Sequence, residues 1–291
     1  MKTIIVPIDF SKESLNGLNF SLQLANKTGA NIQMVHVVDK NEHTNNEQLE
    51  KEHEQAKIKI EDILQKCRAK NSYTCNLDYV IKKGKIYKEI ADIAETYDDP
   101  LIVLSTHRQA GFEELFTDSI AYKIITHSKS PVISVKKSPI SSNIDKIILP
   151  LDITFQTREK VPYTAKLAKI FGSEIHLVSV RLSNITSIER KLHQYIEQAA
   201  SYLEKQNIPY KIKHLHGNNL TNITLDYAHS VNAGLISIMT EQETGFSNLL
   251  LGSYAHQMIN KAEIPVLLFP NYQLRLVTED IWDLGAFNPR S

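Results

Sequence analysis

Residues 4–9 read IIVPID, and residues 147–152 read IILPLD. A short run of aliphatic residues, rich in β-branched side chains, predicts a strand that is buried on both faces of a parallel sheet. The likeness between the two stretches also indicates an internal repeat. A shift of 143 residues aligns ten identical residues among the 34 positions from Ile4 to Val37. The pattern therefore predicts a parallel sheet that occurs twice in the chain.

A second block of sequence repeats at a different offset. Residues 101–135 and 235–269 share eleven identities in 35 positions at a shift of 134, so the second copy is nine residues shorter in its middle. A length of 291 residues suits two domains. The predicted division is domain 1 (1–136), a polar linker (137–144), domain 2 (145–270) and a C-terminal tail (271–291).

Each copy alternates apolar runs with segments of helical periodicity, which predicts right-handed crossovers and a doubly wound parallel sheet. The expected fold class is α/β, with two tandem five-stranded sheets of Rossmann-like type. The strands are expected near 4–8, 31–38, 74–82, 101–105 and 131–135, and near 147–151, 175–180, 209–214, 235–239 and 265–269.

Composition excludes several classes of function. Lys+Arg and Asp+Glu both number 33, so no net charge attracts the chain to nucleic acid or anionic lipid. No apolar run reaches the length of a membrane span, and no signal region follows the first residues, so we expect a cytoplasmic protein. Cys67 and Cys75 lack metal-ligand spacing, the histidines lack a third ligand at short spacing, and no hydrolase or kinase motif occurs. We therefore expect neither a metal site nor a catalytic residue.

Open parallel sheets bind ligands at the carboxyl ends of their strands. Asp9 and Asp152 follow the first strand of each copy, where each carboxylate could cap the next helix or contact a ligand. The fourth strand of each copy leads through residues 105–119 or 239–253 to a helix start, which offers N–H groups to a phosphate. This edge of each sheet is the candidate site.

At these residues the chain resembles the universal stress protein family, over residues 2–136 and 145–270. The resemblance implies an adenine-nucleotide α-hydrolase-like fold and, in nucleotide-binding members, the motif G-x-x-G, nine residues, then G-S or G-T. The positions corresponding to this motif are Ser105, Arg108, Asp118 and Ser119 in domain 1 and Met239, Gln242, Gly252 and Ser253 in domain 2. Only Gly252 keeps a motif glycine.

These departures favour the second domain as the nucleotide site. Asp118 is expected to cap its helix and to repel a polyphosphate, whereas Gly252-Ser253 preserves the helix start that would face the phosphates. The resemblance implies that Asp152 and the backbone near Val180 would hold the adenine side. The domain 2 candidates are Pro150, Asp152, Val180, Ile238, Met239, Gln242, Gly252, Ser253 and Tyr254, and the weaker domain 1 candidates are Pro7, Asp9, Val37, Ser105, His107, Arg108 and Ser119.

The expected function is that of a non-enzymatic stress-response module that binds ATP, ADP or AMP, with Mg²⁺. A scaffold that binds no nucleotide and acts through protein contacts is the main alternative, and a slow ATPase is the third. The last strands, PVISV at 131–135 and PVLLF at 265–269, are apolar and lie at the ends of their units. Pairing them would bury both edges, so we expect an intrachain pseudo-dimer, and the chain could also form a homodimer.

Overall fold

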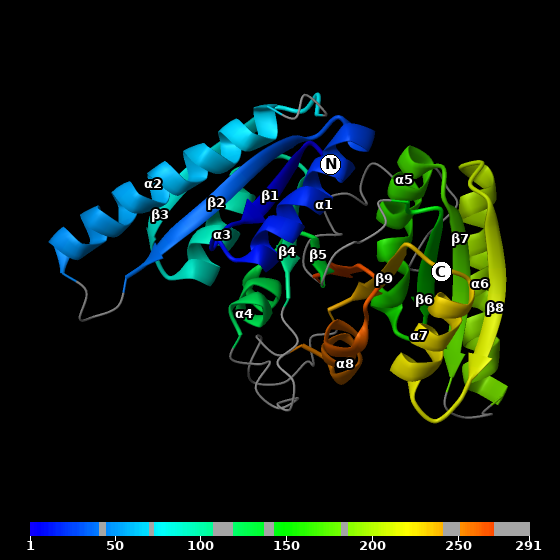
Figure 1. Ribbon diagram of the computed structural model, residues 1–291. Helices are drawn as coiled ribbons and strands as arrows, with labels where there is room; N and C mark the ends of the chain where they lie inside the picture. Colours follow the sequence, from blue (N-terminus) through cyan, green and yellow to red (C-terminus); the bar gives the residue numbers. More distant parts are fainter. Residues whose placement is uncertain are drawn as a thin grey trace. The chain divides into compact units, whose positions relative to one another are not determined.

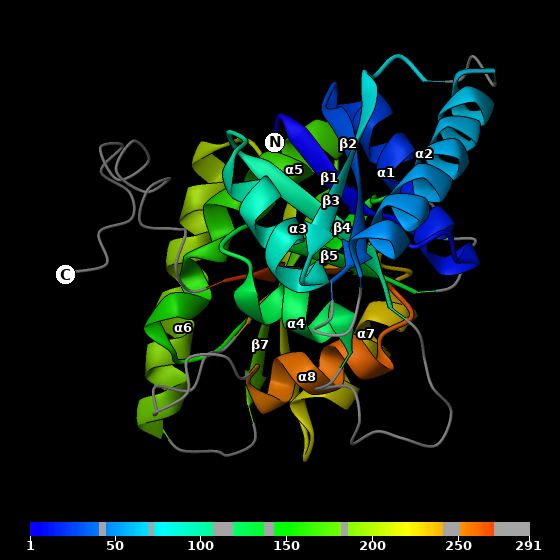
Figure 2. The same cartoon turned by 90° about the vertical axis from the view of Figure 1, so that its left-hand side faces the viewer.

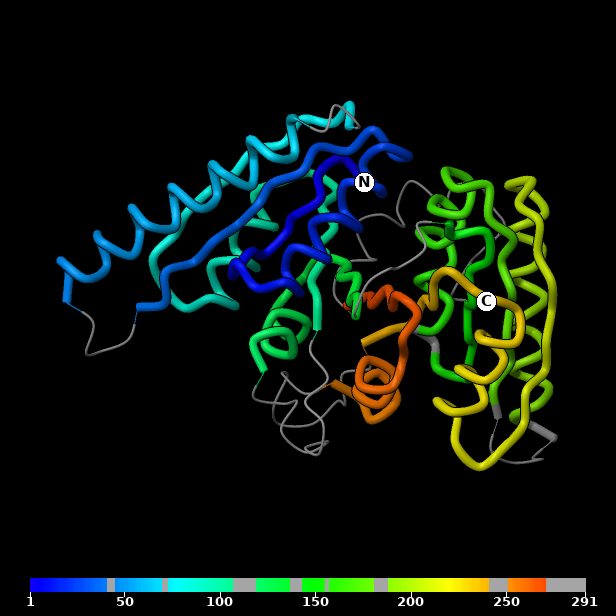
Figure 3. Tube along the Cα trace, in the orientation of Figure 1, coloured from blue at the N-terminus to red at the C-terminus, as the bar shows by residue number. Residues whose placement is uncertain are grey.

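The computed structural model describes residues 1–40, 45–69, 73–106, 119–136, 143–181, 186–240 and 251–270. The chain divides into two compact units, Met1–Ser142 and Asn143–Ser291. Figure 1 shows the elements of both units, and Figure 3 traces the path of the chain through each of them.

The first unit alternates strands with helices. In chain order its elements are β1 (Thr3–Pro7), α1 (Lys12–Thr28), β2 (Asn31–Asp39), α2 (Asn46–Ala69), β3 (Leu77–Gly84), α3 (Ile86–Glu95), β4 (Pro100–Ser105), α4 (Ile120–His127) and β5 (Val132–Val135). Its sheet has the order β3-β2-β1-β4-β5, and all four pairs of neighbouring strands are parallel.

The second unit repeats this order. Its elements are β6 (Lys146–Leu151), the 3-10 helix η2 (Phe155–Arg158), α5 (Lys160–Phe171), β7 (Glu174–Arg181), α6 (Thr186–Lys205), β8 (Tyr210–His216), α7 (Leu220–Ser230), β9 (Leu235–Met239), α8 (Ser253–Lys261) and β10 (Val266–Phe269). The sheet order is β8-β7-β6-β9-β10, again parallel throughout. The predicted fold class, two five-stranded parallel sheets in tandem, is confirmed.

Helices cover both faces of each sheet. In the first unit the chain runs from β1 outward to β3 and then returns past β1 to β4, so right-handed crossovers place α1 and α2 on one face and α3 and α4 on the other. Figure 2 shows α3 and α4 on one side of strands β1 to β4 and α1 and α2 on the other, and α3 packs against α4. Because both faces are covered, the central strands are almost wholly apolar, as in Ile4, Ile5 and Val6 of β1.

The first helix of each unit ends at a glycine. Gly29 after α1 and Gly172 after α5 have φ angles of 69° and 68°, in the left-handed region that glycine adopts at little cost. Gly29 and Gly172 therefore close the equivalent helices of the two units. The helix starts differ, because Ser11 caps α1 with its side chain, whereas Glu159 makes no side-chain cap bond to α5.

Candidate functional site

The carboxyl ends of the central strands form the candidate site in each unit. In the first unit β1 pairs with β2 on one side and with β4 on the other, and the direction of the chain through the sheet reverses between β1 and β4. A parallel sheet opens a crevice at such a point. Asp9 follows β1 there, Ser105 ends β4, and Val37 lies near the end of β2.

The second unit places its candidates in the same way. Asp152 follows β6, Met239 ends β9, and Val180 lies near the end of β7, where it pairs with Leu215 of β8. The structure therefore brings the predicted residues of strands β6, β7 and β9 to one edge of the sheet. Gln242, and also His107, Arg108 and Asp118 of the first unit, lie outside the described residues.

A loop of hydrogen bonds holds Asp9 at the end of β1. Its Oδ1 accepts from the backbone N of Ser11 at 2.9 Å and from the Ser11 hydroxyl at 2.5 Å, while its own N donates to Ser14 Oγ at 3.4 Å. The Ser11 hydroxyl also caps α1, since Ser14 N donates to it at 3.1 Å. Asp9 is therefore not the cap of this helix; it orients the residue that is.

Asp152 is held by the equivalent bonds. Its Oδ1 accepts from the N of Thr154 at 2.7 Å and from Thr154 Oγ1 at 2.5 Å, and its N donates to Thr157 Oγ1 at 3.2 Å. Both copies thus carry hydroxyls two and five residues after the aspartate. The sequence shows this spacing, and we did not predict its role. Within the described part of the chain, no donor reaches Oδ2 of Asp152, so this oxygen can accept from a ligand.

The hydrogen bonds around Asp9 change its acidity. Partial burial on its own raises the pKa of the carboxyl group, but hydrogen bonds from Ser11 and Ser14 outweigh it, and the pKa of Asp9 is lowered overall. The carboxylate form is therefore the one that this loop stabilises.

The helices after the fourth strands begin differently in the two units. Ser119 is the N-cap of α4, and Tyr122 N donates to its hydroxyl at 3.1 Å. The prediction that Asp118 caps this helix is therefore wrong, because the cap position is one residue later. In the second unit Gly252 occupies the cap position, and the exposed Ser253 begins α8, whose first turn contains no acidic residue.

Several predicted residues contribute backbone rather than side chain to this edge. The side chains of Val37, Val180 and Ile238 are buried, and that of Met239 is only 6% exposed. That the backbone near Val180 would hold the adenine side stays a prediction. Tyr254 is half-buried, and its hydroxyl donates to Thr224 Oγ1 at 3.3 Å.

Lys160 is a candidate that we did not predict. It is the first residue of α5 and only 2% exposed, and its Nζ donates to the carbonyl oxygen of Thr157 at 2.8 Å and to Thr157 Oγ1 at 3.0 Å. Fully buried lysines are rare in proteins. Thr157 Oγ1 also accepts from Asp152 N, so one threonine links the ammonium group to the loop of the aspartate.

The repeat shows where Lys160 points. The shift of 143 aligns it with Gly17, and a Cβ at Gly17 would lie 3.6 Å from Ser105 N, at the end of β4. By this equivalence the Cβ of Lys160 is expected near the end of β9, while its ammonium group bonds to Thr157. In the sequence, the exchange of Gly17 for Lys160 between the two copies is the signal that could have identified Lys160 as a candidate. In the first unit Ser105 Oγ is buried and, among the described residues, has no hydrogen-bond partner.

The described residues contain neither a candidate membrane span nor a candidate metal cluster. No helix among them is both long and apolar enough to cross a membrane. In the same ranges no three side chains of His, Cys, Asp or Glu converge as a metal-binding group would require.

Comparison with known proteins decides the family. The sequence model of the universal stress protein family matches residues 1–136 and 143–270. The chain belongs to this family. Over 146 residues it is 25% identical to Universal stress protein MJ0531 from Methanocaldococcus jannaschii, an alignment that covers 47% of this chain and 82% of that protein.

Solved structures support the fold of this universal stress protein over nearly its whole length. A universal stress protein from Archaeoglobus fulgidus DSM 4304 matches 92% of this chain and 96% of its own with a TM-score of 0.75 and 19% identity. A Pseudomonas aeruginosa UCBPP-PA14 protein assigned to the universal stress proteins matches 97% of both chains, with a TM-score of 0.68 and 15% identity. At these identities the likeness concerns the fold alone.

Proposed function

We propose that this universal stress protein is a cytoplasmic stress-response module whose second domain binds an adenine nucleotide with Mg²⁺ and does not turn it over. The observation that carries the proposal is the link between Asp152 and Lys160 through Thr157 at the carboxyl edge of the sheet. In this proposal Asp152 accepts a hydrogen bond from a sugar hydroxyl, and Lys160 provides a positive charge for phosphate. Both residues lie at the edge where such sheets bind ligands.

The start of α8 adds to this site. Its first backbone N–H groups and its dipole favour an anion, and no carboxylate of its first turn opposes one. The first unit lacks the lysine, because Gly17 occupies the equivalent position. The second unit is therefore the better site for a polyphosphate.

Thermal unfolding of the full chain with millimolar ATP, ADP or AMP and Mg²⁺ tests the proposal. A ligand that binds only the folded protein stabilises it by about 2.7 kcal/mol when its concentration is roughly 100 times its Kd. Ser253→Tyr should abolish the shift, because its ring would lie at the start of α8, where the phosphates are proposed to bind. Ser253 is exposed and makes no cap bond, so the substitution removes no bond of the fold. Ser119→Tyr in the first unit should keep the shift produced by the nucleotide, although it lowers the stability without ligand because the Ser119 hydroxyl caps α4.

Lys160→Met tests the role of the charge. Methionine keeps most of the length of the side chain, so the expected result is a smaller stabilisation by ATP and a nearly unchanged one by AMP, which carries fewer phosphates. Equal losses for both nucleotides would contradict a role in binding phosphate.

A scaffold without nucleotide is the alternative, and the replacement of motif glycines by Met239 and Gln242 favours it. The absence of any thermal shift would support it. Slow ATP hydrolysis would appear as release of labelled phosphate that Asp152→Ala abolishes. Pairing of the two domains through their last strands stays a prediction from the sequence.

A further inference from the structure

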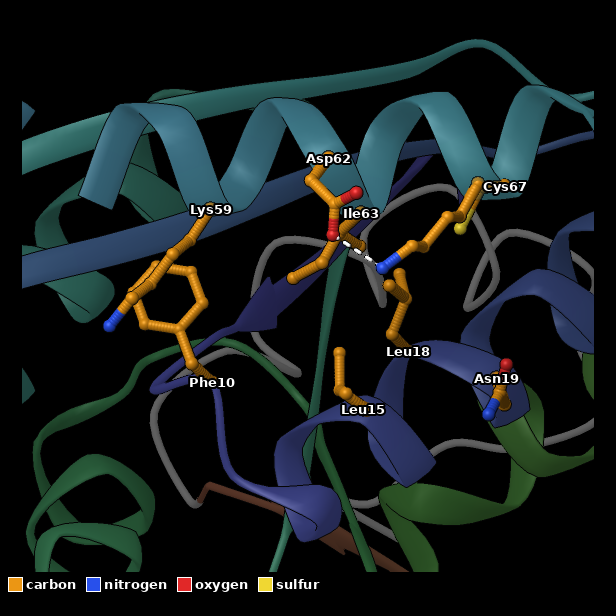
Figure 4. A pocket seen from close by; sticks show the side chains of 9 residues that line it. Phe10, Leu15, Leu18, Asn19, Lys59, Asp62, Ile63 and Cys67 are labelled. Carbon is orange, nitrogen blue, oxygen red and sulfur yellow. Dashed lines mark hydrogen bonds and ion pairs between the residues drawn. The ribbon is translucent and has the colours of Figure 1, made fainter. Parts of the chain in front are cut away.

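A pocket lies in the first unit between helices α1 and α2, and none of the residues that line it is a nucleotide candidate, although Phe10 directly follows Asp9. Its volume is about 480 Å³, within the range of small-molecule sites. Figure 4 shows α2 above the pocket and α1 below it. The lining residues are Phe10, Leu15, Leu18, Asn19, Lys59, Asp62, Ile63, Lys66 and Cys67.

The second unit shows why the first unit has this space. The shift of 143 aligns Leu15 with Arg158. Arg158 reaches helix α6, where its guanidinium lies 3.9 Å from the centre of the Tyr195 ring and donates to Gln198 Oε1 at 2.5 Å. A buried long side chain thus fills the region between the first two helices of the second unit. Leu15 is too short to do the same between α1 and α2.

The two ends of the pocket differ in chemistry. Lys59 and Phe10 lie at one end, with the ammonium 5.3 Å from the centre of the ring, and Asn19 and Cys67 lie at the other. Three aliphatic side chains, Leu15, Leu18 and Ile63, lie between these ends.

The charge of the pocket favours an anion. Lys66 is neutralised by Asp62, whose Oδ2 lies 2.6 Å from Nζ. Within the part of the chain that the structure describes, Lys59 has no carboxylate within ion-pair distance. The lining thus has two ammonium groups and one carboxylate, a net charge of plus one, and the unneutralised charge lies at one end.

The pocket is elongated. Lys59 and Cys67 are eight residues apart on α2, a span of about 12 Å at 1.5 Å per residue. A space of this length, with aliphatic side chains between its ends and a cation at one end, fits an extended alkyl chain with one anionic head better than a compact molecule.

We propose that this pocket binds a medium-chain carboxylate, with its head group at Lys59 and its alkyl chain along Leu15, Leu18 and Ile63 toward Cys67. The inference does not depend on the proposed nucleotide site, because none of its residues belongs to the second unit. The charge of Lys59 gives the preference for an anionic head group. The alkyl chain of the ligand contributes affinity by burying apolar surface.

Calorimetric titration of the full chain with decanoate, below the concentration at which it forms micelles, tests the proposal. We expect saturable binding of one decanoate per chain and a loss of affinity of at least about tenfold in Lys59→Met. The control Lys57→Met removes an exposed lysine of the same helix that does not line the pocket, and it should bind as the wild type does. Decanol, which has the same chain without the charge, should bind as weakly to the wild type as decanoate does to Lys59→Met.

The two cysteines give a second readout that locates the ligand. Decanoate should slow the alkylation of Cys67 by iodoacetamide and leave that of Cys75 unchanged, because only Cys67 lines the pocket. Leu15→Arg, which copies the residue of the second unit, should abolish both the binding and the protection.

Three results would overturn the proposal: no saturable binding, equal binding of decanoate by the wild type and Lys59→Met, or binding that survives in Leu15→Arg without protecting Cys67.

Discussion

Thr164 and Ser237 form a buried pair of hydroxyls between α5 and β9, one helical turn from Lys160. Both residues are 0% exposed, and their oxygens are 2.7 Å apart. Thr164 Oγ1 also lies 2.8 Å from the carbonyl oxygen of Lys160, which can only accept, so the threonine donates to that carbonyl and Ser237 donates to the threonine. Ser237 thus depends on Thr164 for its acceptor.

This direction of donation predicts unequal effects of two substitutions. Thr164→Val keeps the volume but leaves the Ser237 hydroxyl buried without an acceptor, which costs about 1–3 kcal/mol. Ser237→Ala removes the donor and leaves Thr164 bonded to the Lys160 carbonyl, so it should cost about 0.5–1.5 kcal/mol. The first unit already has the second arrangement, since Ser21 donates to the Gly17 carbonyl at 2.8 Å and the residue equivalent to Ser237 is Val103.

Urea unfolding of the full chain, followed by circular dichroism, measures both substitutions and the double variant. Thr164→Val/Ser237→Ala should be more stable than Thr164→Val alone, because no buried donor is left unpaired, and the coupling should be about 1 kcal/mol. If Thr164→Val costs no more than Ser237→Ala, or if the two effects simply add, the assignment of donor and acceptor is refuted.

Three further predictions concern local structure. Ser11→Ala should destabilise the protein by about 1 kcal/mol near neutral pH through loss of the α1 cap. The lowered pKa of Asp9 stabilises the folded protein above the ordinary pKa of an aspartate, about 3.9, and this stabilisation is lost as the pH falls through the pKa of the folded state. The loss of stability caused by Ser11→Ala should therefore become smaller in acid. A loss of stability that does not change with pH would contradict this prediction. Gly172→Ala should lower the free energy of unfolding in urea by about 1–2 kcal/mol, because a Cβ there meets no atom within 4 Å and only the left-handed backbone conformation opposes it. Gly172→Asn should lower it less, because asparagine adopts this conformation more readily than alanine. Tyr227→Phe should cost about 1–3 kcal/mol, since its hydroxyl lies 2.7 Å from Nδ1 of His176, which is 2% exposed; an unchanged urea midpoint would show that another group satisfies this nitrogen.

The fold could be predicted from the sequence because its signals are local and occur twice. IIVPID and IILPLD predicted the first strand of each unit, and these strands are β1 and β6. The alternation of strands and helices also predicted parallel strands joined by right-handed crossovers, but the order of the strands was known only from the structure.

The site was predicted less completely, because its details depend on contacts between distant residues. Asp9 and Asp152 were placed at the correct edge, but a single sequence does not show which hydroxyl a carboxylate oxygen accepts from. Lys160 was missed because a lysine in an amphipathic helix is usually exposed. Its burial depends on the packing of α5 on β9, which periodicity alone does not determine.

Two neighbouring positions explain how the units came to differ. Leu15 and Gly17 of the first unit correspond to Arg158 and Lys160 of the second, so each small or aliphatic residue has a long cationic counterpart. Arg158 reaches from η2 to Tyr195 and Gln198 of α6, and Lys160 places a buried ammonium group beside Thr157. The same pair of exchanges therefore accounts for the pocket between α1 and α2 in the first unit and for the buried charge in the second. If both proposals hold, the two domains bind different ligands: a medium-chain carboxylate between α1 and α2 of the first, and a nucleotide at the strand ends of the second.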